Sequence, residues 1–84
     1  MAHTQDWKVR LHLFEEEGTT KAHAVLDLGG TEISGQGVAR RNPHDRDVPE
    51  IGDELAAGRA MNDLAQKLLS VARTDIEGVA HPGP

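Results

Sequence analysis

The sequence contains no cysteine at any of its 84 positions. This absence excludes disulfide bridges, thiolate zinc sites and cysteine nucleophiles. Aromatic residues are scarce as well: Trp7 and Phe14 are the only two, and hydrophobic residues make up 37% of the chain. A chain of this length buries only about 60–65% of its unfolded surface, so its own core is small. We therefore expect one domain over residues 1–84, with flexible ends at 1–6 and 81–84, that gains further burial as a homodimer.

The chain also lacks a hydrophobic run of membrane-spanning length, and its first residues do not follow the pattern of a signal peptide. The absence of cysteine fits a reducing compartment, so we expect a cytoplasmic protein that does not contact membranes. Acidic residues outnumber basic ones by 14 to 9, which gives a formal net charge of −5. This balance argues against a general nucleic-acid binder, which needs a basic surface.

Three segments alternate between apolar and polar residues, and a period of two is typical of half-buried strands. The segments are residues 7–14, 20–28 and 32–40. Gly29 and Gly30 lie between the second and the third, and such a pair is a signal for a two-residue hairpin turn. The sequence therefore predicts a three-stranded antiparallel meander.

One register places apolar residues opposite each other along the whole inner face of this meander. In the first hairpin, pairing Glu15 with Thr20 sets Leu13, Leu11, Val9 and Trp7 opposite Ala22, Ala24, Leu26 and Leu28, respectively. In the second hairpin, the glycine turn sets Leu26, Ala24 and Ala22 opposite Ile33, Gly35 and Gly37, respectively. A slip of one residue would turn charged side chains toward the core. One end of the inner face is smooth, because it carries Ala22, Ala24, Gly35, Gly37 and Ala39. Glycine weakens a strand unless another backbone comes close, so we expect a helix to pack there.

Residues 50–73 carry apolar residues at helical spacing, which predicts one long helix on the sheet. The predicted packing stripe is Ile51, Leu55, Gly58, Met61, Ala65, Leu68, Leu69 and Ala72, with Gly58 allowing close contact with the smooth end. Asp47 is the predicted N-cap, and Pro49 fits the first turn because its missing N–H would be unpaired there. The spacing of Thr74 and Glu77 is that of a capping box and predicts a short extra helix at 75–80. The predicted fold class is α+β, in the order β-β-β-α.

The residues that could carry out chemistry do not form a recognisable site. In the predicted register His12 and His23 are neighbours on the outer face of the sheet, but a stable metal site needs three or four ligands, so an exposed pair is favoured. Ser34 and Ser70 lack the context of a catalytic nucleophile, and no glycine-rich segment directly precedes a helix. A sheet of three strands with one helix also offers little enclosure for a small-molecule substrate. We expect no enzyme, no catalytic residue, no cofactor and no metal.

Basic residues gather on the outer face of the predicted sheet and in the loop that follows it. The candidate contact residues for a partner or RNA are Lys8, Arg10, Lys21, Arg40, Arg41 and Arg46. Three interpretations of this face stay open: a solvated surface, a surface for self-association, and a contact with nucleic acid or the ribosome. Local charge can support binding even on an acidic protein.

The block ARRNPHDRDVPEIGDELAAGRAMNDLAQKLL, residues 39–69, resembles a family of small actinobacterial proteins of unknown function. That family is represented among mycobacterial proteins associated with dormancy and hypoxia. Supporting matches are Trp7 with Val9 near the start, and Asp75-Ile76-Glu77 with His81 near the end. The resemblance implies a dimer with a fold similar to double-stranded-RNA-binding domains and, at the level of the fold, to ribosome hibernation factors.

Two functional hypotheses follow. The first is a non-enzymatic, dimeric accessory protein of stress or dormancy that acts through protein contacts. The alternative is an RNA- or ribosome-binding factor that silences translation through the six basic residues named above. The two hypotheses differ in whether the protein sediments with ribosomes in a salt-sensitive manner.

Overall fold

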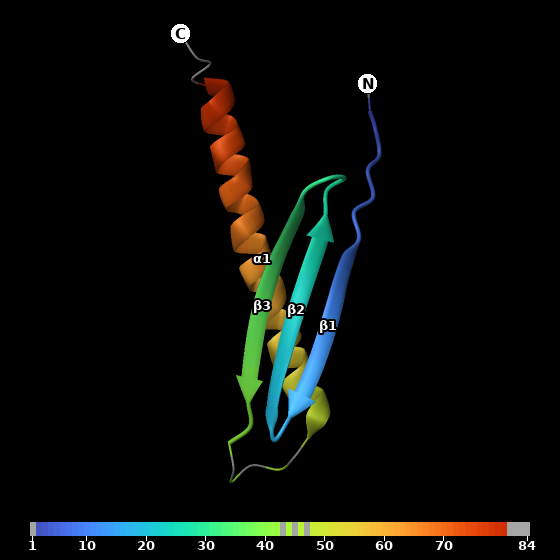
Figure 1. The fold of residues 1–84 in the computed structure, drawn as a ribbon, viewed down its shortest axis with the longest axis vertical. Helices are drawn as coiled ribbons and strands as arrows, with labels where there is room; N and C mark the ends of the chain where they lie inside the picture. Colours follow the sequence, from blue (N-terminus) through green and yellow to red (C-terminus); the bar gives the residue numbers. More distant parts are fainter. Residues whose placement is uncertain (1, 43, 45, 47, 81–84) are drawn as a thin grey trace.

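The computed structural model describes residues 2–42, 44, 46 and 48–80. Within them the chain forms β1 (Val9–Glu16), β2 (Thr19–Asp27), β3 (Glu32–Arg40) and one helix, α1 (Pro49–Ala80). The strands form an antiparallel sheet in the order β1-β2-β3, and α1 crosses one side of it (Figure 1). The predicted α+β fold, with three strands followed by a long helix, is confirmed.

Both hairpin turns are two residues long and use backbone conformations that favour glycine. Glu17 and Gly18 have positive φ angles of 49° and 75° in the first turn, and Gly29 and Gly30 have φ angles of 77° and 106° in the second. The Leu28 N–H donates to the Thr31 carbonyl oxygen at 2.9 Å and closes the second turn. Because only Glu17 and Gly18 are needed for the first turn, β1 continues through Glu16, two residues beyond its predicted end.

The predicted register is confirmed along both ladders. Leu13, Leu11 and Val9 pair with Ala22, Ala24 and Leu26, and these three pair in turn with Gly37, Gly35 and Ile33. Trp7 lies just before β1 and outside the ladder. The residues of β2 and β3 on this face form the core together with Ala56, Ala60 and Leu64 of α1.

The smooth end of the sheet does receive the helix backbone. A Cβ atom added to Gly35 would overlap the Ala60 carbonyl oxygen and the Leu64 nitrogen, and one added to Gly37 would overlap the Ala56 carbonyl oxygen. No side chain larger than hydrogen fits at either glycine while the helix keeps its place. The predicted close approach at Gly35 and Gly37 is therefore confirmed.

The predicted packing stripe of the helix is wrong except at Leu68, which packs against the core. The side chains that face the sheet are Ala56, Ala60 and Leu64, with Gly52 and Leu68 partly buried at the two ends. Ile51, Leu55, Met61 and Leu69 are exposed, and the surroundings of Gly58 are open. The physical reason is size: the closely approaching strand backbone leaves room for alanine, so the larger aliphatic residues lie elsewhere on the helix.

The predicted start of the helix is confirmed, and its predicted end needs a correction. Pro49 begins the helix as expected, and the Ile51 N–H donates to the Val48 carbonyl oxygen at 3.0 Å. The short extra helix at 75–80 does not exist, because α1 continues without a break to Ala80. The Thr74 hydroxyl donates to the Ser70 carbonyl oxygen at 3.1 Å, a bond within one helix, and does not cap a new one. The predicted N-cap, Asp47, lies outside the described residues.

Three side chains of α1 bond to the outer edge of β3. The Arg59 Nη1 donates to the Val38 carbonyl oxygen at 2.7 Å, the Gln36 N–H donates to the Asp63 Oδ2 at 2.9 Å, and the Lys67 Nζ donates to the Ser34 carbonyl oxygen at 2.9 Å. Lys67 also pairs with Asp63 at 3.1 Å. These three residues are four apart, so they follow one side of the helix. Three outward backbone groups of β3, the Ser34 and Val38 carbonyl oxygens and the Gln36 N–H, are thereby bonded within the chain.

Candidate functional site

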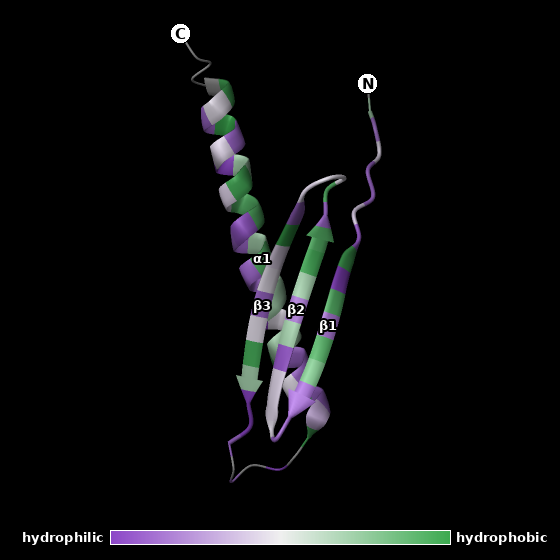
Figure 2. Ribbon diagram, viewed as in Figure 1, coloured by the Kyte–Doolittle hydropathy of each residue, from purple (hydrophilic) through white to green (hydrophobic). Residues whose placement is uncertain are grey.

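The helix leaves the β1 part of the sheet uncovered. α1 packs mainly against β3 and β2 and touches β1 least. Ala22, Ala24 and Leu26 of β2 are buried, whereas Val9, Leu11 and Leu13, beside them on β1, remain 39%, 40% and 44% exposed. Trp7, which is also exposed, precedes the strand at the next position of the same alternation. We call these four residues, Trp7, Val9, Leu11 and Leu13, the open face; the apolar alternation along β1 is visible in Figure 2.

A second set of exposed apolar side chains lies along α1. It consists of Ile51, Leu55, Met61, Leu69, Ile76 and Val79, all exposed, and we call it the helix stripe. Exposure rises toward the end of the helix, to 65% at Ile76 and 80% at Val79. There α1 extends past the end of the sheet (Figure 1). The stripe contains most of the large residues that the sequence predicted would pack inside.

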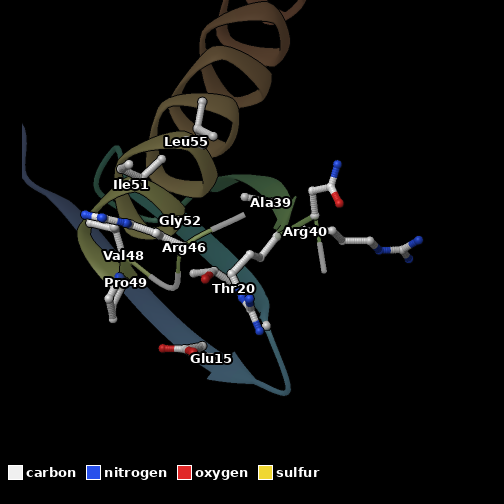
Figure 3. A pocket seen from close by; sticks show the side chains of 13 residues that line it. Glu15, Thr20, Ala39, Arg40, Arg46, Val48, Pro49, Ile51, Gly52 and Leu55 are labelled. Atoms are coloured by element: carbon white, nitrogen blue, oxygen red, sulfur yellow. The ribbon is translucent and has the colours of Figure 1, made fainter. Parts of the chain in front are cut away.

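A hollow of about 420 Å³ lies between the first hairpin and the start of the helix. Figure 3 shows its walls: Ile51 and Leu55 belong to α1, and Thr20 and Glu15 belong to the strands. Thr20 is 4% exposed, and its hydroxyl has no hydrogen bond to any described residue. The hollow is open and mostly apolar, so it suits an aliphatic side chain better than a polar substrate.

The six predicted contact residues do not form one basic surface. Lys21 and Arg40 line a second hollow of about 290 Å³ on the outer face, together with Phe14, Glu16 and Glu17. Lys8 and Arg10 lie toward the other end of β1, and Arg10 pairs with Glu32 at 3.7 Å. Arg41 and Arg46 line the first hollow, on the helix side, and Arg40 also borders it. Acidic residues lie beside each group, so positive charge is divided among three places.

His12 and His23 lie directly opposite each other in the register, as predicted. Within the described part of the chain, no group of three or more histidine, aspartate or glutamate side chains gathers where it could hold a metal ion. The described residues also include no helix that is both long and apolar enough to cross a membrane.

Sequence reasoning missed the open face because it placed the large residues of the helix on the wrong side. The signal that could have found the true packing side is the series Gly52, Ala56, Ala60, Leu64 and Leu68, spaced by four. Such small residues match the glycines of β3 in size. With α1 rotated to that side, no other described element covers the inner face of β1.

Comparison with known proteins gives a consistent picture. The family model described as Rv2632c-like matches residues 5–83. An uncharacterized protein of Mycobacterium bovis, Mb1767, is 49% identical over 77 residues, which cover 92% of this chain and 82% of that protein. The uncharacterized protein Rv2632c of Mycobacterium tuberculosis is 43% identical over 67 residues, covering 80% of this chain and 72% of its own length. The crystal structure of Rv2632c superimposes with a TM-score of 0.90 and 35% identity over 98% of both chains. The chain therefore belongs to the Rv2632c-like family.

Proposed function

We propose that this protein is a non-enzymatic, homodimeric accessory protein that acts through protein contacts in the cytoplasm. The observation that carries the proposal is the open face. Leu11 and its neighbours on β1 lie on the same side of the sheet as the core and yet keep about two-fifths of their surface exposed. Burial of apolar surface contributes about 25 cal/mol per Å², so association that covers these residues is favourable.

The shape of the single chain supports the same proposal. Its radius of gyration is 17.2 Å, and its principal extents are 60 × 27 × 20 Å. A compact domain of this length has a radius of gyration of about 12 Å. The excess comes from α1 and the segment before β1, which extend past the end of the sheet (Figure 1). Such a chain reaches an ordinary level of burial only by association.

The proposed role in stress or dormancy rests on the resemblance of residues 39–69 to mycobacterial proteins associated with dormancy and hypoxia. It is tested by affinity capture of the tagged protein from aerated and from oxygen-starved cells, with mass spectrometry of the bound proteins and sequencing of the bound RNA. A protein partner that is specific to the starved culture supports the role. The same bound proteins in both cultures contradict it.

The homodimer is tested by light scattering of the purified protein. We expect about twice the mass of the 9.1 kDa chain. Replacing Leu11→Asp places a charge in the open face and should give the mass of a monomer. Leu69→Asp is the matched control, because Leu69 is at least as exposed but lies on the helix stripe; it should leave the dimer intact. A wild-type monomer, or a Leu11→Asp dimer that stays intact, contradicts the proposal.

The second candidate is an RNA- or ribosome-binding protein, and the outer face gives it specific support. Phe14 is exposed there directly opposite Lys21, and Arg40 lines the same 290 Å³ hollow. An aromatic ring next to two cations is the combination that binds single-stranded nucleic acid by stacking and by phosphate contacts. Phe14→Ala and Arg40→Ala should then abolish salt-sensitive cosedimentation with ribosomes, whereas Leu69→Asp should not. Absence of cosedimentation in low salt excludes this candidate.

A further inference from the structure

The two edges of the sheet are treated differently by the rest of the chain. On β3, the outward backbone groups of Ser34, Gln36 and Val38 bond to side chains of α1. On β1, no described residue supplies a comparable bond. An uncovered edge strand is a template for another strand, and proteins usually protect both edges. The eight residues of β1 therefore form the one sheet edge that the described chain leaves open.

The register shows which groups of β1 point outward. The Gln36 N–H points away from β2, toward Asp63. Gln36 and its partner His23 therefore form a pair without backbone hydrogen bonds between them. The backbone groups of His23 point the other way, toward its partner His12 on β1. Residues alternate along an antiparallel ladder. The backbone groups that face the open edge are consequently those of Val9, Leu11, Leu13 and Glu15.

We propose that two copies of the chain join their β1 strands edge to edge, antiparallel, about a two-fold axis beside His12. This inference rests on the proposed homodimer and names the surface that forms it. The two three-stranded sheets become one continuous sheet with both helices on the same side. Backbone hydrogen bonds across the axis give the contact its geometry, and the open face gives it apolar burial.

Strand length leaves two registers for this contact, and the position of Glu15 separates them. β1 is centred between residues 12 and 13, so the fullest overlap places either His12 or Leu13 on the axis. The axis at His12 sets Leu11 of one copy opposite Leu13 of the other on the inner face. On the outer face it sets Lys8 of each copy opposite Glu16 of the other, so the dimer contains this pair twice. Both registers set Glu15 opposite an apolar residue. The axis at Leu13 would set it opposite Leu11, in the middle of the apolar row, whereas the axis at His12 sets it opposite Val9, near the end of that row, where a carboxylate is less enclosed.

The same arrangement covers the part of the open face that is farthest from its own helix. α1 begins behind the end of β1, where Ile51 and Leu55 line one hollow with Glu15 (Figures 1 and 3). The two-fold axis brings the start of the other copy's helix to the opposite end of β1, beside Trp7 and Val9. Exposed aliphatic residues of one copy then meet exposed apolar residues of the other.

The test uses the absence of native cysteine, so that each variant carries a single thiol. His12→Cys places two thiols across the axis in a pair that is not hydrogen-bonded, where Cα atoms are about 4.5 Å apart, within the range of a disulfide. We expect mild oxidation to convert most of this variant to a covalent dimer. His23→Cys is the matched control: it lies on the same outer face, one strand away from the edge, and should stay monomeric on a denaturing gel.

The outcomes separate this inference from the proposed function. A wild-type monomer in light scattering overturns both. An alternative outcome is a wild-type dimer in which Ala65→Cys, on the exposed side of α1, forms the crosslink and His12→Cys forms none. That result overturns the strand pairing alone and assigns the dimer contact to the helices. Efficient crosslinking of His12→Cys with no crosslinking of His23→Cys supports the strand pairing.

Charge reversal tests the register independently. Lys8→Glu and Glu16→Lys should each weaken the dimer several-fold, because each places like charges opposite each other twice. The double variant should restore the wild-type dissociation constant. Additive weakening in the double variant overturns the register with His12 on the axis.

Discussion

At the scale of single residues, Gly35 sets the distance between sheet and helix. A methyl group at this position would meet the backbone of Ala60 and Leu64, which cannot move without shifting the helix. We expect Gly35→Ala to lower the free energy of unfolding by at least about 2 kcal/mol. Urea denaturation followed by circular dichroism measures this change.

Gly58 is the matched control for that experiment. It lies mid-helix on the exposed side, where an added methyl group meets nothing. Gly58→Ala should therefore raise the free energy of unfolding by up to about 1 kcal/mol, because alanine favours the helix. Opposite signs for the same substitution would confirm the side on which α1 packs; a loss of stability at Gly58 would contradict it.

The carboxylate of Asp63 contacts two groups, the backbone N–H of Gln36 on β3 and the ammonium group of Lys67 on α1. The N–H of Gln36 donates to its carboxylate and Lys67 lies beside it, so the pKa of Asp63 is lowered from its ordinary value of 3.8. A group with a lower pKa in the folded state contributes stability above its unfolded pKa. This contribution is lost as the pH falls through the folded pKa.

The change that tests this is Asp63→Asn. We expect it to lower the free energy of unfolding near neutral pH, and the difference from wild type to shrink as the pH falls below about 4. Glu77→Gln, at an exposed position near the end of the helix, should change stability little at either pH. A difference at Asp63 that does not depend on pH would contradict the role of its ionised form.

At the scale of elements, the two halves of α1 differ in what holds them. The part up to Leu68 packs on the sheet, while residues 69–79 are all exposed. Thirty-two residues of helix are about 48 Å long, whereas nine residues of strand span about 30 Å. Most helical stability in proteins comes from packing, so the extension is held mainly by its own backbone bonds.

Amide hydrogen exchange should therefore be slow around Ala56, Ala60 and Leu64 and at least a hundredfold faster beyond Val71. Mass spectrometry of peptides from the two halves measures the difference. Equal protection along the whole helix would mean that the extension is covered in solution, and it would assign the association surface to the helix stripe.

The strands could be predicted from sequence far better than the side of the helix. Alternation, two short turns and the match of apolar pairs restrict a meander to one register, so pairs such as Leu11 with Ala24 follow from local pattern. The rotation of α1 depends on fit between surfaces distant in sequence. Two sides of the helix are apolar, one with small residues around Ala56 and Ala60, and one with large residues such as Leu55 and Leu69. Hydrophobicity alone predicts that the side with large residues packs on the sheet. The close approach of the helix to Gly35 and Gly37 requires the side with small residues to pack there.

The candidate site was only partly predictable for the same reason. The positions of Lys21 and Arg40 on the outer face follow from strand alternation, and both lie there. The open face could not be predicted, because Leu11 and Leu13 look like core residues until the side of the sheet that α1 covers is known. Which surface stays uncovered depends on how the elements pack. The spacing of apolar residues along the sequence does not determine it.

At the scale of the whole molecule, the single chain is elongated. A monomeric variant such as Leu11→Asp should keep the 17.2 Å radius of gyration of the folded chain in small-angle X-ray scattering, increased only by its hydration layer. A value near 12 Å, which a compact domain of this length would have, would contradict the extended position of α1. Far-ultraviolet circular dichroism of the same sample checks that the variant is folded.

The side chains of α1 on the edge of β3 have a consequence for growth. Arg59, Asp63 and Lys67 occupy the backbone groups to which an incoming strand would bond. In the proposed dimer, both outer borders of the enlarged sheet are β3 strands that carry these bonds. We therefore expect assembly to stop at a pair and not to continue into filaments.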